Sequence, residues 1–202
     1  MIDVKQFVAA LFLIVWNAIG CISLNDDPKR EDAWTILAKQ EIEEINSGSR
    51  DSLSLMYTRE TDKLLTLIDP DAQFHHAYFL LTDISKSGIA EMASGRGVRS
   101  INLVCTTNPE GILEAIAEID SLRKLSFESI PLTKSGIEAL QKRSLIEELK
   151  FSSDETERLP FDLVSSLKKI ATLRKLVINE TEVALDPKDS TIEPSDDARP
   201  ER

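Results

Sequence analysis

Aromatic residues are scarce in this chain, at 5% of 202 residues, although 42% of the residues are apolar. The core of the protein must therefore be mainly aliphatic. Two cysteines are too few for a small disulfide-rich domain, and seven glycines with eight prolines exclude a collagen-like chain. Basic residues are also in deficit, 24 against 35 acidic residues, which leaves a net charge of −11. Because nucleic-acid binding requires a basic surface, we expect no nucleic-acid partner.

The N-terminal segment differs in composition from the rest of the chain. An unbroken apolar run over residues 7–16 follows Lys5 and precedes the small residue Gly20. A short basic region, an apolar core of about 7–15 residues and a small residue at the cleavage site are typical of a secretory signal peptide. A membrane-spanning helix needs about 20 apolar residues, and Asn17 interrupts this run. We therefore predict a signal peptide over residues 1–20 and an exported protein, with an uncleaved anchor or a buried helix as the alternatives.

The residues around the expected cleavage site suggest lipid attachment. Ala18-Ile19-Gly20-Cys21 resembles the bacterial lipobox, in which a small residue precedes a cysteine that is lipidated and becomes the new N-terminus. Ala18 departs from the pattern, because the family prefers Leu at that position. The resemblance implies lipidation at Cys21, a polar tether over residues 21–30 and membrane anchoring at the bacterial cell envelope. Ordinary cleavage at the same site is the alternative, and it would give a soluble secreted or periplasmic protein.

The C-terminal residues 184–202 form a second segment of distinct composition. They are rich in Pro, Asp and Glu and contain one isolated aliphatic residue, Ile192. Such a segment has too little apolar surface to bury, so we predict a disordered acidic tail.

A repeat of 24 residues runs through the middle of the chain. Lys86-Ser87-Gly88-Ile89 recurs as Lys134-Ser135-Gly136-Ile137, at twice that interval. The pattern apolar-x-x-apolar-x-apolar keeps the interval of 24 in four copies and recurs once more after 27 residues. Its apolar positions are Phe74, Ala77 and Phe79; Val98, Ile101 and Leu103; Leu122, Leu125 and Phe127; Ile146, Leu149 and Phe151; and Leu173, Leu176 and Ile178. A degenerate copy has Arg50 in the first slot, followed by Leu53 and Leu55.

Each repeat unit contains the signals of one strand and one helix. The second and third apolar positions are two residues apart, which is the period of a strand with one buried face. Between the strands the apolar residues change to helical spacing. Three such stripes are Ile112, Leu113, Ile116 and Ile119; Ile137 and Leu140; and Leu163, Leu167 and Ile170. Because neither element can bury its apolar side alone, successive units must stack to form one continuous core.

The units resemble leucine-rich repeats, whose pattern is L-x-x-L-x-L-x-x-N/C-x-L with a period of 20–29 residues. Thr82-Asp83-Ile84, Thr106 and Thr181-Glu182-Val183 stand in the place of the usual Asn and its following aliphatic residue. Ile130 and Asp154 occupy the same position, so the chain lacks the asparagine ladder of the family. The resemblance implies an α/β fold, a short solenoid over residues 49–183 with a parallel sheet on its concave face and helices on its convex face. An ordinary α/β domain with accidental spacing is the alternative.

Residues 31–48 precede the repeats and have the spacing of one amphipathic helix. Trp34, Leu37 and Ile45 are expected on its apolar side, and Glu41, Glu43 and Glu44 away from it. The terminal units of a solenoid need a polar outer face to stay soluble. We therefore predict that this helix caps the N-terminal end of the array.

The residue types that carry chemistry form no pattern typical of catalysis. His75 and His76 are adjacent in an expected strand, so their side chains point to opposite faces and make a poor metal site. No G-x-S-x-G motif marks a serine nucleophile. We therefore predict no catalytic residue, no metal and no cofactor. An enzyme, or an accessory subunit of an enzyme, that uses His75 or His76 is kept as the alternative.

The expected concave face exposes the residues that flank the second and third apolar positions. Ten of them are predicted to contact a partner: His76, Tyr78, Leu80, Asn102, Val104, Lys124, Glu128, Glu148, Lys150 and Lys175. Exposed aromatic and aliphatic residues among polar ones suit a protein interface, and Tyr78, Leu80 and Val104 gather on the N-terminal side. A solvated sheet face that binds nothing is the alternative.

Taken together, these features predict a non-enzymatic protein-binding or scaffold module at the bacterial cell envelope. It presents a concave repeat surface to a protein partner, and we expect a monomer. A passive structural surface lipoprotein is the further alternative.

Overall fold

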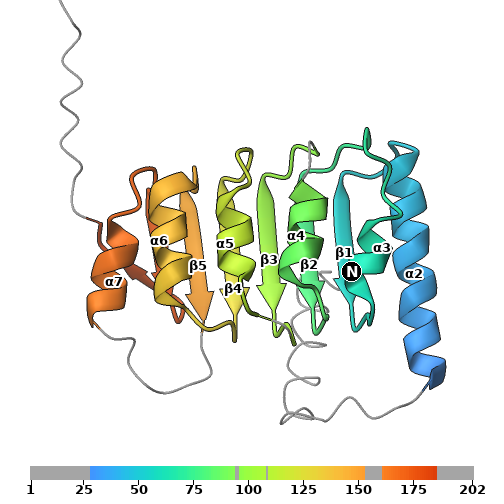
Figure 1. Ribbon diagram of the computed structural model, residues 1–202, viewed down its shortest axis with the longest axis horizontal. Coiled ribbons are helices and arrows are strands. Elements are labelled where there is room, and N and C mark those ends of the chain that lie inside the picture. Colours follow the sequence, from blue (N-terminus) through green and yellow to red (C-terminus); the bar gives the residue numbers. More distant parts are fainter. Residues whose placement is uncertain (1–27, 94–95, 108, 153–160, 186–202) are drawn as a thin grey trace, which may run out of the picture.

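The computed structural model describes residues 28–93, 96–107, 109–152 and 161–185 (Figure 1). Within these residues, seven strands form one sheet in which their spatial order equals their order in the chain. They are β1 (Ser52–Met56), β2 (His76–Leu80), β3 (Ser100–Val104), β4 (Lys124–Glu128), β5 (Glu148–Ser152), β6 (Lys175–Ile178) and β7 (Thr181–Val183). Strands β1 to β6 pair parallel, and β7 pairs antiparallel with β6. The structure thus confirms an α/β protein with a mostly parallel sheet.

The helices cover one face of this sheet. In the described part of the chain they are α2 (Pro28–Asn46), α3 (Thr61–Leu65), α4 (Lys86–Ala93), α5 (Ile112–Ala117), α6 (Lys134–Arg143) and α7 (Phe161–Lys168). Helices α3 to α7 connect successive parallel strands and follow one another along the same side of the sheet, whereas α2 stands beside β1 (Figure 1). None of these described helices is long and apolar enough to cross a bilayer.

The pairing register of the strands repeats the interval found in the sequence. Ile101 in β3 pairs with Leu125 in β4, which in turn pairs with Leu149 in β5, so partners are 24 residues apart. The same offset of 24 joins β1 to β2 and β2 to β3, and an offset of 27 joins β5 to β6. Buried residues therefore meet buried residues of the neighbouring strand on one face, and half-buried or exposed residues meet one another on the other.

The core lies between the sheet and the helices α3 to α7 and is mainly aliphatic, as predicted. Both predicted strand positions are buried in each strand from β1 to β5, and Leu176 is buried in β6. The predicted helical stripes meet them, with Ile116, Leu140 and Leu167 among their buried members. Where two aromatic residues are paired, Phe127 and Phe151 on neighbouring strands, their ring centroids are 5.0 Å apart. Stacking of successive units thus produces one continuous apolar layer.

A left-handed backbone residue follows each of the first four strands. Tyr57, Leu81, Cys105 and Ser129 have φ between 51° and 55°, and they recur at the repeat interval. Each donates its backbone N–H to the last carbonyl of the next strand, as in the bond of 2.9 Å from Leu81 to Val104. Because this conformation costs a non-glycine residue about 1–2 kcal/mol, the hydrogen bond to the neighbouring strand offsets part of that strain.

The predicted N-terminal helix of residues 31–48 is present as α2, with different ends. It begins at Pro28, which suits the first turn of a helix, and ends at Asn46. Residues 28–30, which the sequence assigned to the tether, are therefore helical. The predicted signal peptide, Cys21, the rest of the tether and residues 186–202 of the predicted tail lie outside the described residues. Leu185, also assigned to the tail, packs against the core.

The buried side of α2 differs from the prediction. Ala38, Ile42 and Ile45 are buried against the first unit, whereas Leu37, expected on this side, is 50% exposed. The observed stripe, Ala38, Ile42 and Ile45, has spacings of four and three residues. The prediction that Glu41 and Glu44 lie away from the packed side is also wrong, since both contact Arg50 in the segment leading into β1.

A hairpin with a two-residue loop forms the edge of the sheet opposite β1. Asn179 and Glu180 both have positive φ, at 45° and 64°, as a type I′ turn between β6 and β7 requires. The resemblance to leucine-rich repeats placed Thr181-Glu182-Val183 in the loop after the last strand. Instead these residues turn back to form β7, because the left-handed turn reverses the chain.

Arg96 is a buried charge that links two helical segments. It is 2% exposed and donates from Nη1 to the Glu91 carbonyl at 2.9 Å and from Nη2 to the Ile68 carbonyl at 3.0 Å. Burial lowers the pKa of Arg96, and the Glu91 carboxylate, 3.8 Å away, opposes that effect. The guanidinium therefore joins the end of the α3 segment to α4.

The glycine of the repeated Lys-Ser-Gly-Ile segment lies where adjacent helices approach most closely. A Cβ atom on Gly136 would lie 2.8 Å from the Leu113 Cβ of α5, and one on Gly88 would overlap the Asp62 carboxylate of α3. The Thr133 hydroxyl also accepts the Gly136 N–H at 3.0 Å and so caps α6. The repeated motif therefore encodes a close helix contact together with a helix start.

We predict that Gly136→Ala lowers the free energy of unfolding by about 1–3 kcal/mol, because the added methyl group overlaps Leu113. Lys134→Ala, at an exposed position of the same turn, should change it by less than about 0.5 kcal/mol. Urea denaturation of both variants measures the difference. Equal stabilities for the two variants would contradict the close helix approach.

Candidate functional site

The face of the sheet opposite the helices carries the candidate site. Along each strand the residues alternate between buried core positions and half-buried or exposed positions. We call the second set the open face: Ser52, Ser54 and Met56; His76, Tyr78 and Leu80; Ser100, Asn102 and Val104; Lys124, Ser126 and Glu128; Glu148, Lys150 and Ser152; and Lys175 and Val177. All ten residues predicted to contact a partner lie on it, on β2 to β6.

Apolar and aromatic side chains gather on the open face at β1 to β3. Met56, Leu80 and Val104 are register partners on adjacent strands and are all half-buried. Tyr78 precedes Leu80 by two residues and lies on the same face. Burial raises the pKa of the Tyr78 phenol above its ordinary value, and the nearby Glu128 carboxylate raises it further. We call these four residues the apolar patch; they resemble the anchor positions of protein interfaces.

Charged side chains occupy the open face at β4 to β6. Lys124 forms an ion pair of 3.0 Å with its register partner Glu148. Lys175 is the register partner of Glu148 on the other side, and Lys150 lies two residues further along β5. The sequence pattern predicted the gathering of Tyr78, Leu80 and Val104 on the N-terminal side of this face and mixed charges elsewhere on it, but it did not include Met56 of β1.

A second row of charges, one residue before the strands, was missed by the sequence analysis. Arg99, Arg123, Glu147 and Arg174 precede β3, β4, β5 and β6, and successive members are joined by backbone hydrogen bonds of 2.8 to 2.9 Å. Glu147 lies 3.9 Å from both Arg123 and Arg174. The sequence does contain a sign of this row, because a charged residue directly precedes each of the strands β3 to β6. The repeat pattern considered above includes only apolar positions and therefore leaves these residues out.

The side chains of the two histidines lie in different surroundings, as expected for adjacent residues of an extended segment. His76 is exposed on the open face, whereas His75 is half-buried with its Nδ1 atom 3.3 Å from the Gly97 carbonyl oxygen. In the part of the chain that the structure describes, no group of three or more potential ligands could hold a metal ion.

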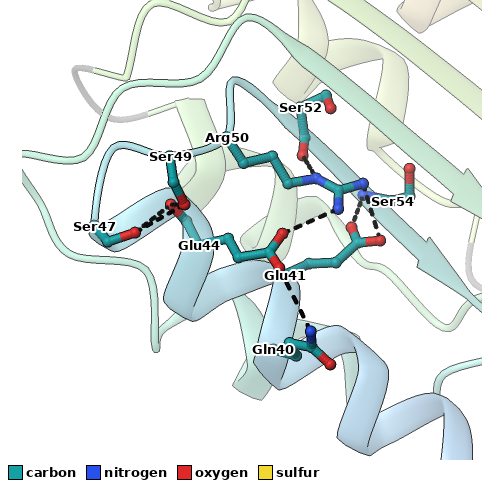
Figure 2. Close-up of polar contacts among 8 residues, drawn as sticks. All are labelled: Gln40, Glu41, Glu44, Ser47, Ser49, Arg50, Ser52 and Ser54. Carbon is teal, nitrogen blue, oxygen red and sulfur yellow. Dashed lines mark hydrogen bonds and ion pairs between the residues drawn. The ribbon is translucent and has the colours of Figure 1, made fainter.

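A cluster of eight polar residues lies at the free edge of β1 (Figure 2). Arg50 donates from Nε to the Ser52 carbonyl at 2.6 Å and forms ion pairs with Glu41 at 3.0 Å and Glu44 at 3.3 Å. The other carboxylate oxygen of Glu41 accepts the Ser54 N–H at 2.7 Å. These partners satisfy two backbone groups of β1, the Ser52 carbonyl and the Ser54 N–H. The cluster therefore protects a sheet edge, which would otherwise offer a template for strand addition.

Two serines of the same cluster bind a carbonyl at the C-terminal end of α2. The Glu44 carbonyl accepts hydrogen bonds from the Ser47 hydroxyl at 2.8 Å and from the Ser49 hydroxyl at 3.0 Å (Figure 2). Burial raises the pKa of Glu41 above its ordinary value, although the Ser54 N–H and Arg50 both lower it. Because each polar group has a structural partner, this cluster has a structural role and the open face remains the candidate site.

We predict that Glu41→Ala lowers the free energy of unfolding by about 1–3 kcal/mol, because it leaves the Ser54 N–H without its acceptor and removes one of the two ion-pair partners of Arg50. Glu41→Gln retains a carbonyl acceptor and should cost less. Glu43→Ala, at an exposed site on the same helix, should stay within about 0.5 kcal/mol of the wild type. Urea denaturation measures all three, and a loss in Glu43→Ala as large as in Glu41→Ala would reject the edge-protection role.

Comparison with known proteins leaves the open face to be interpreted from its own chemistry. No protein-family model matches the chain, and no curated protein matches it.

Proposed function

We propose that this chain is a non-enzymatic protein-binding or scaffold module, built as a short leucine-rich-repeat solenoid. The observation that carries this proposal is the open face: six parallel strands each contribute residues to it, and no described element covers it, whereas the opposite face is buried under helices. The constant register of 24 residues supports the repeat interpretation. So does the alternation of one strand and one helix in each unit.

Hydrogen bonds between units also support a leucine-rich-repeat architecture. At the position of the usual asparagine, the Thr106 hydroxyl donates to the Ile84 carbonyl of the preceding unit at 3.2 Å. The Thr107 N–H donates to the Thr82 carbonyl at 3.0 Å. Threonine thus performs part of the bonding between neighbouring loops that the asparagine ladder of the family performs.

The binding mechanism is presentation of a preorganised surface. Interstrand hydrogen bonds and a packed core hold the backbone of the open face, so little conformational entropy remains to be lost when a partner binds. The apolar patch provides side chains that a partner can bury, and the surrounding polar positions provide orientation. The protein acts as a monomer in this proposal.

The proposed site of action is the bacterial cell envelope. The order of basic residue, apolar run, Gly20 and Cys21 supports export and lipid attachment. A lipid on Cys21 holds the repeats close to the membrane, since only residues 22–27 separate it from α2.

Site-specific photo-crosslinking in the producing cells tests the binding function. A photoreactive residue replacing Ser126, at the centre of the open face, should give an adduct with one partner protein. Tyr78→Ser combined with Leu80→Ser should reduce that adduct about tenfold or more, because it removes two anchors. The same photoreactive residue at Lys142, exposed on α6, is the matched control. Adducts that form equally at both positions, or only at Lys142, would contradict binding by the open face; urea denaturation verifies that the serine variant is folded.

Mass spectrometry of the mature protein tests the anchoring. The expected N-terminal residue is Cys21 with a diacylglyceryl group on Sγ, and the protein should partition with membranes. Cys21→Ser should abolish the lipid mass and release the protein from the membrane fraction. A mature chain that begins at another residue, or an unmodified Cys21, would refute lipid anchoring without affecting the binding proposal.

A further inference from the structure

Basic side chains outnumber acidic ones on β4 to β6 of the open face and in the row of residues that directly precedes β3 to β6. Six basic side chains lie there: Arg99, Arg123, Lys124, Lys150, Arg174 and Lys175. Four acidic side chains lie among or beside them: Glu128, Glu147, Glu148 and Glu182, the register partner of Val177 on β7. Within the described residues no ion pair involves Arg99, Lys150 or Lys175, and all three are exposed. This surplus is local, because the whole chain has a net charge of −11.

The free cations are too widely spaced for a single small anion. Strands in a sheet lie about 4.8 Å apart, so Arg99 before β3 and Lys175 on β6 are separated by three strand steps, about 14 Å. Lys175 pairs with Glu148, and Lys150 lies two residues further along β5. Lys150 is therefore displaced from the row of Lys175 by about 7 Å in the direction of the strands. A ligand that contacts all three must carry several negative charges in an extended arrangement.

The neighbouring surface distinguishes between classes of polyanion. The apolar patch of Met56, Tyr78, Leu80 and Val104 lies on the same face, and Val104 is the register partner of Glu128 on β4. A phosphate polymer has no aliphatic group to bury there, and because every unit is charged it cannot place a neutral unit beside Glu128, Glu147 and Glu148. A polypeptide can carry carboxylates and an apolar side chain in one segment.

We propose that the open face recognises an acidic polypeptide segment with an apolar residue at one end. The segment lies across the strands, with its carboxylates against Arg99, Lys150 and Lys175 and its apolar side chain against Tyr78, Leu80 and Val104. This proposal rests on the proposed protein-binding function and specifies the chemistry of the partner. Electrostatic complementarity of this kind speeds association and sets the orientation of the bound segment.

Fluorescence anisotropy with the full chain tests the proposal. The probe is a labelled peptide with a run of glutamates followed by Leu-Phe-Leu, titrated at about 20 mM and about 200 mM salt. It should bind with a dissociation constant below about 1 mM at the lower salt concentration and more weakly at the higher one. Lys150→Glu combined with Lys175→Glu should weaken binding about tenfold or more, whereas Lys142→Glu combined with Lys169→Glu, on the helix side, should have little effect. The two double variants change the net charge equally.

Comparison probes separate the two parts of the proposed segment. Replacing Leu-Phe-Leu by serines should weaken binding to the wild type and have little effect on the Tyr78→Ser and Leu80→Ser double variant. Failure of the acidic peptide to bind, an equal loss in both lysine pairs, or tighter binding of inorganic polyphosphate would overturn the proposal. A partner crosslinked at Ser126 would then still support the protein-binding function, whereas the absence of any open-face adduct would remove that function itself.

Discussion

The fixed register between parallel strands is the constraint on which the rest of this structure depends. Side chains alternate between two faces along a strand, so a slip of one residue would expose the apolar set and bury the polar one. The alignment of Ala77, Ile101, Leu125 and Leu149 across four strands prevents such a slip. Both faces follow from this alignment, because it gathers one set of residues into a core under the helices and the other set into the rows of the open face.

A stack of parallel strands has two edges, and this protein closes them by different means. At β1, where the other units have a buried apolar residue in the first slot, Arg50 instead reaches Glu41 and Glu44 of α2. Two backbone groups of β1 are thereby satisfied by side chains rather than by another strand: the Ser54 N–H by Glu41 of α2 and the Ser52 carbonyl by Arg50. At the other end the β6–β7 hairpin provides a short, polar last strand, which is itself a poor template for further pairing.

The open face combines two kinds of surface on one rigid support. Its charged rows place Arg123 and Lys124 beside Glu147 and Glu148, and these beside Arg174 and Lys175. Opposite charges on neighbouring strands favour the observed register, although each exposed pair contributes at most about 1 kcal/mol. Basic groups outnumber acidic ones in these rows, so the same ladder that supports the register leaves charge for a partner. Affinity and orientation can therefore come from different halves of one face.

The sequence by itself determined strands β1 to β6, most of the aliphatic core and the rows of the open face on β2 to β6, because a period of two within each strand and of 24 between most strands assigns their residues to a side. Local patterns gave no sign of the left-handed residues Tyr57 and Leu81 or of the burial of Arg96. They also assigned Glu41 to the wrong side of α2. Those features depend on polar partners distant in the chain: the Glu41 carboxylate binds a backbone N–H 13 residues away, and Arg96 binds a carbonyl 28 residues away. Only the tertiary structure decided them, since the cost of a strained backbone or a buried charge is offset by a neighbour that the fold brings into contact.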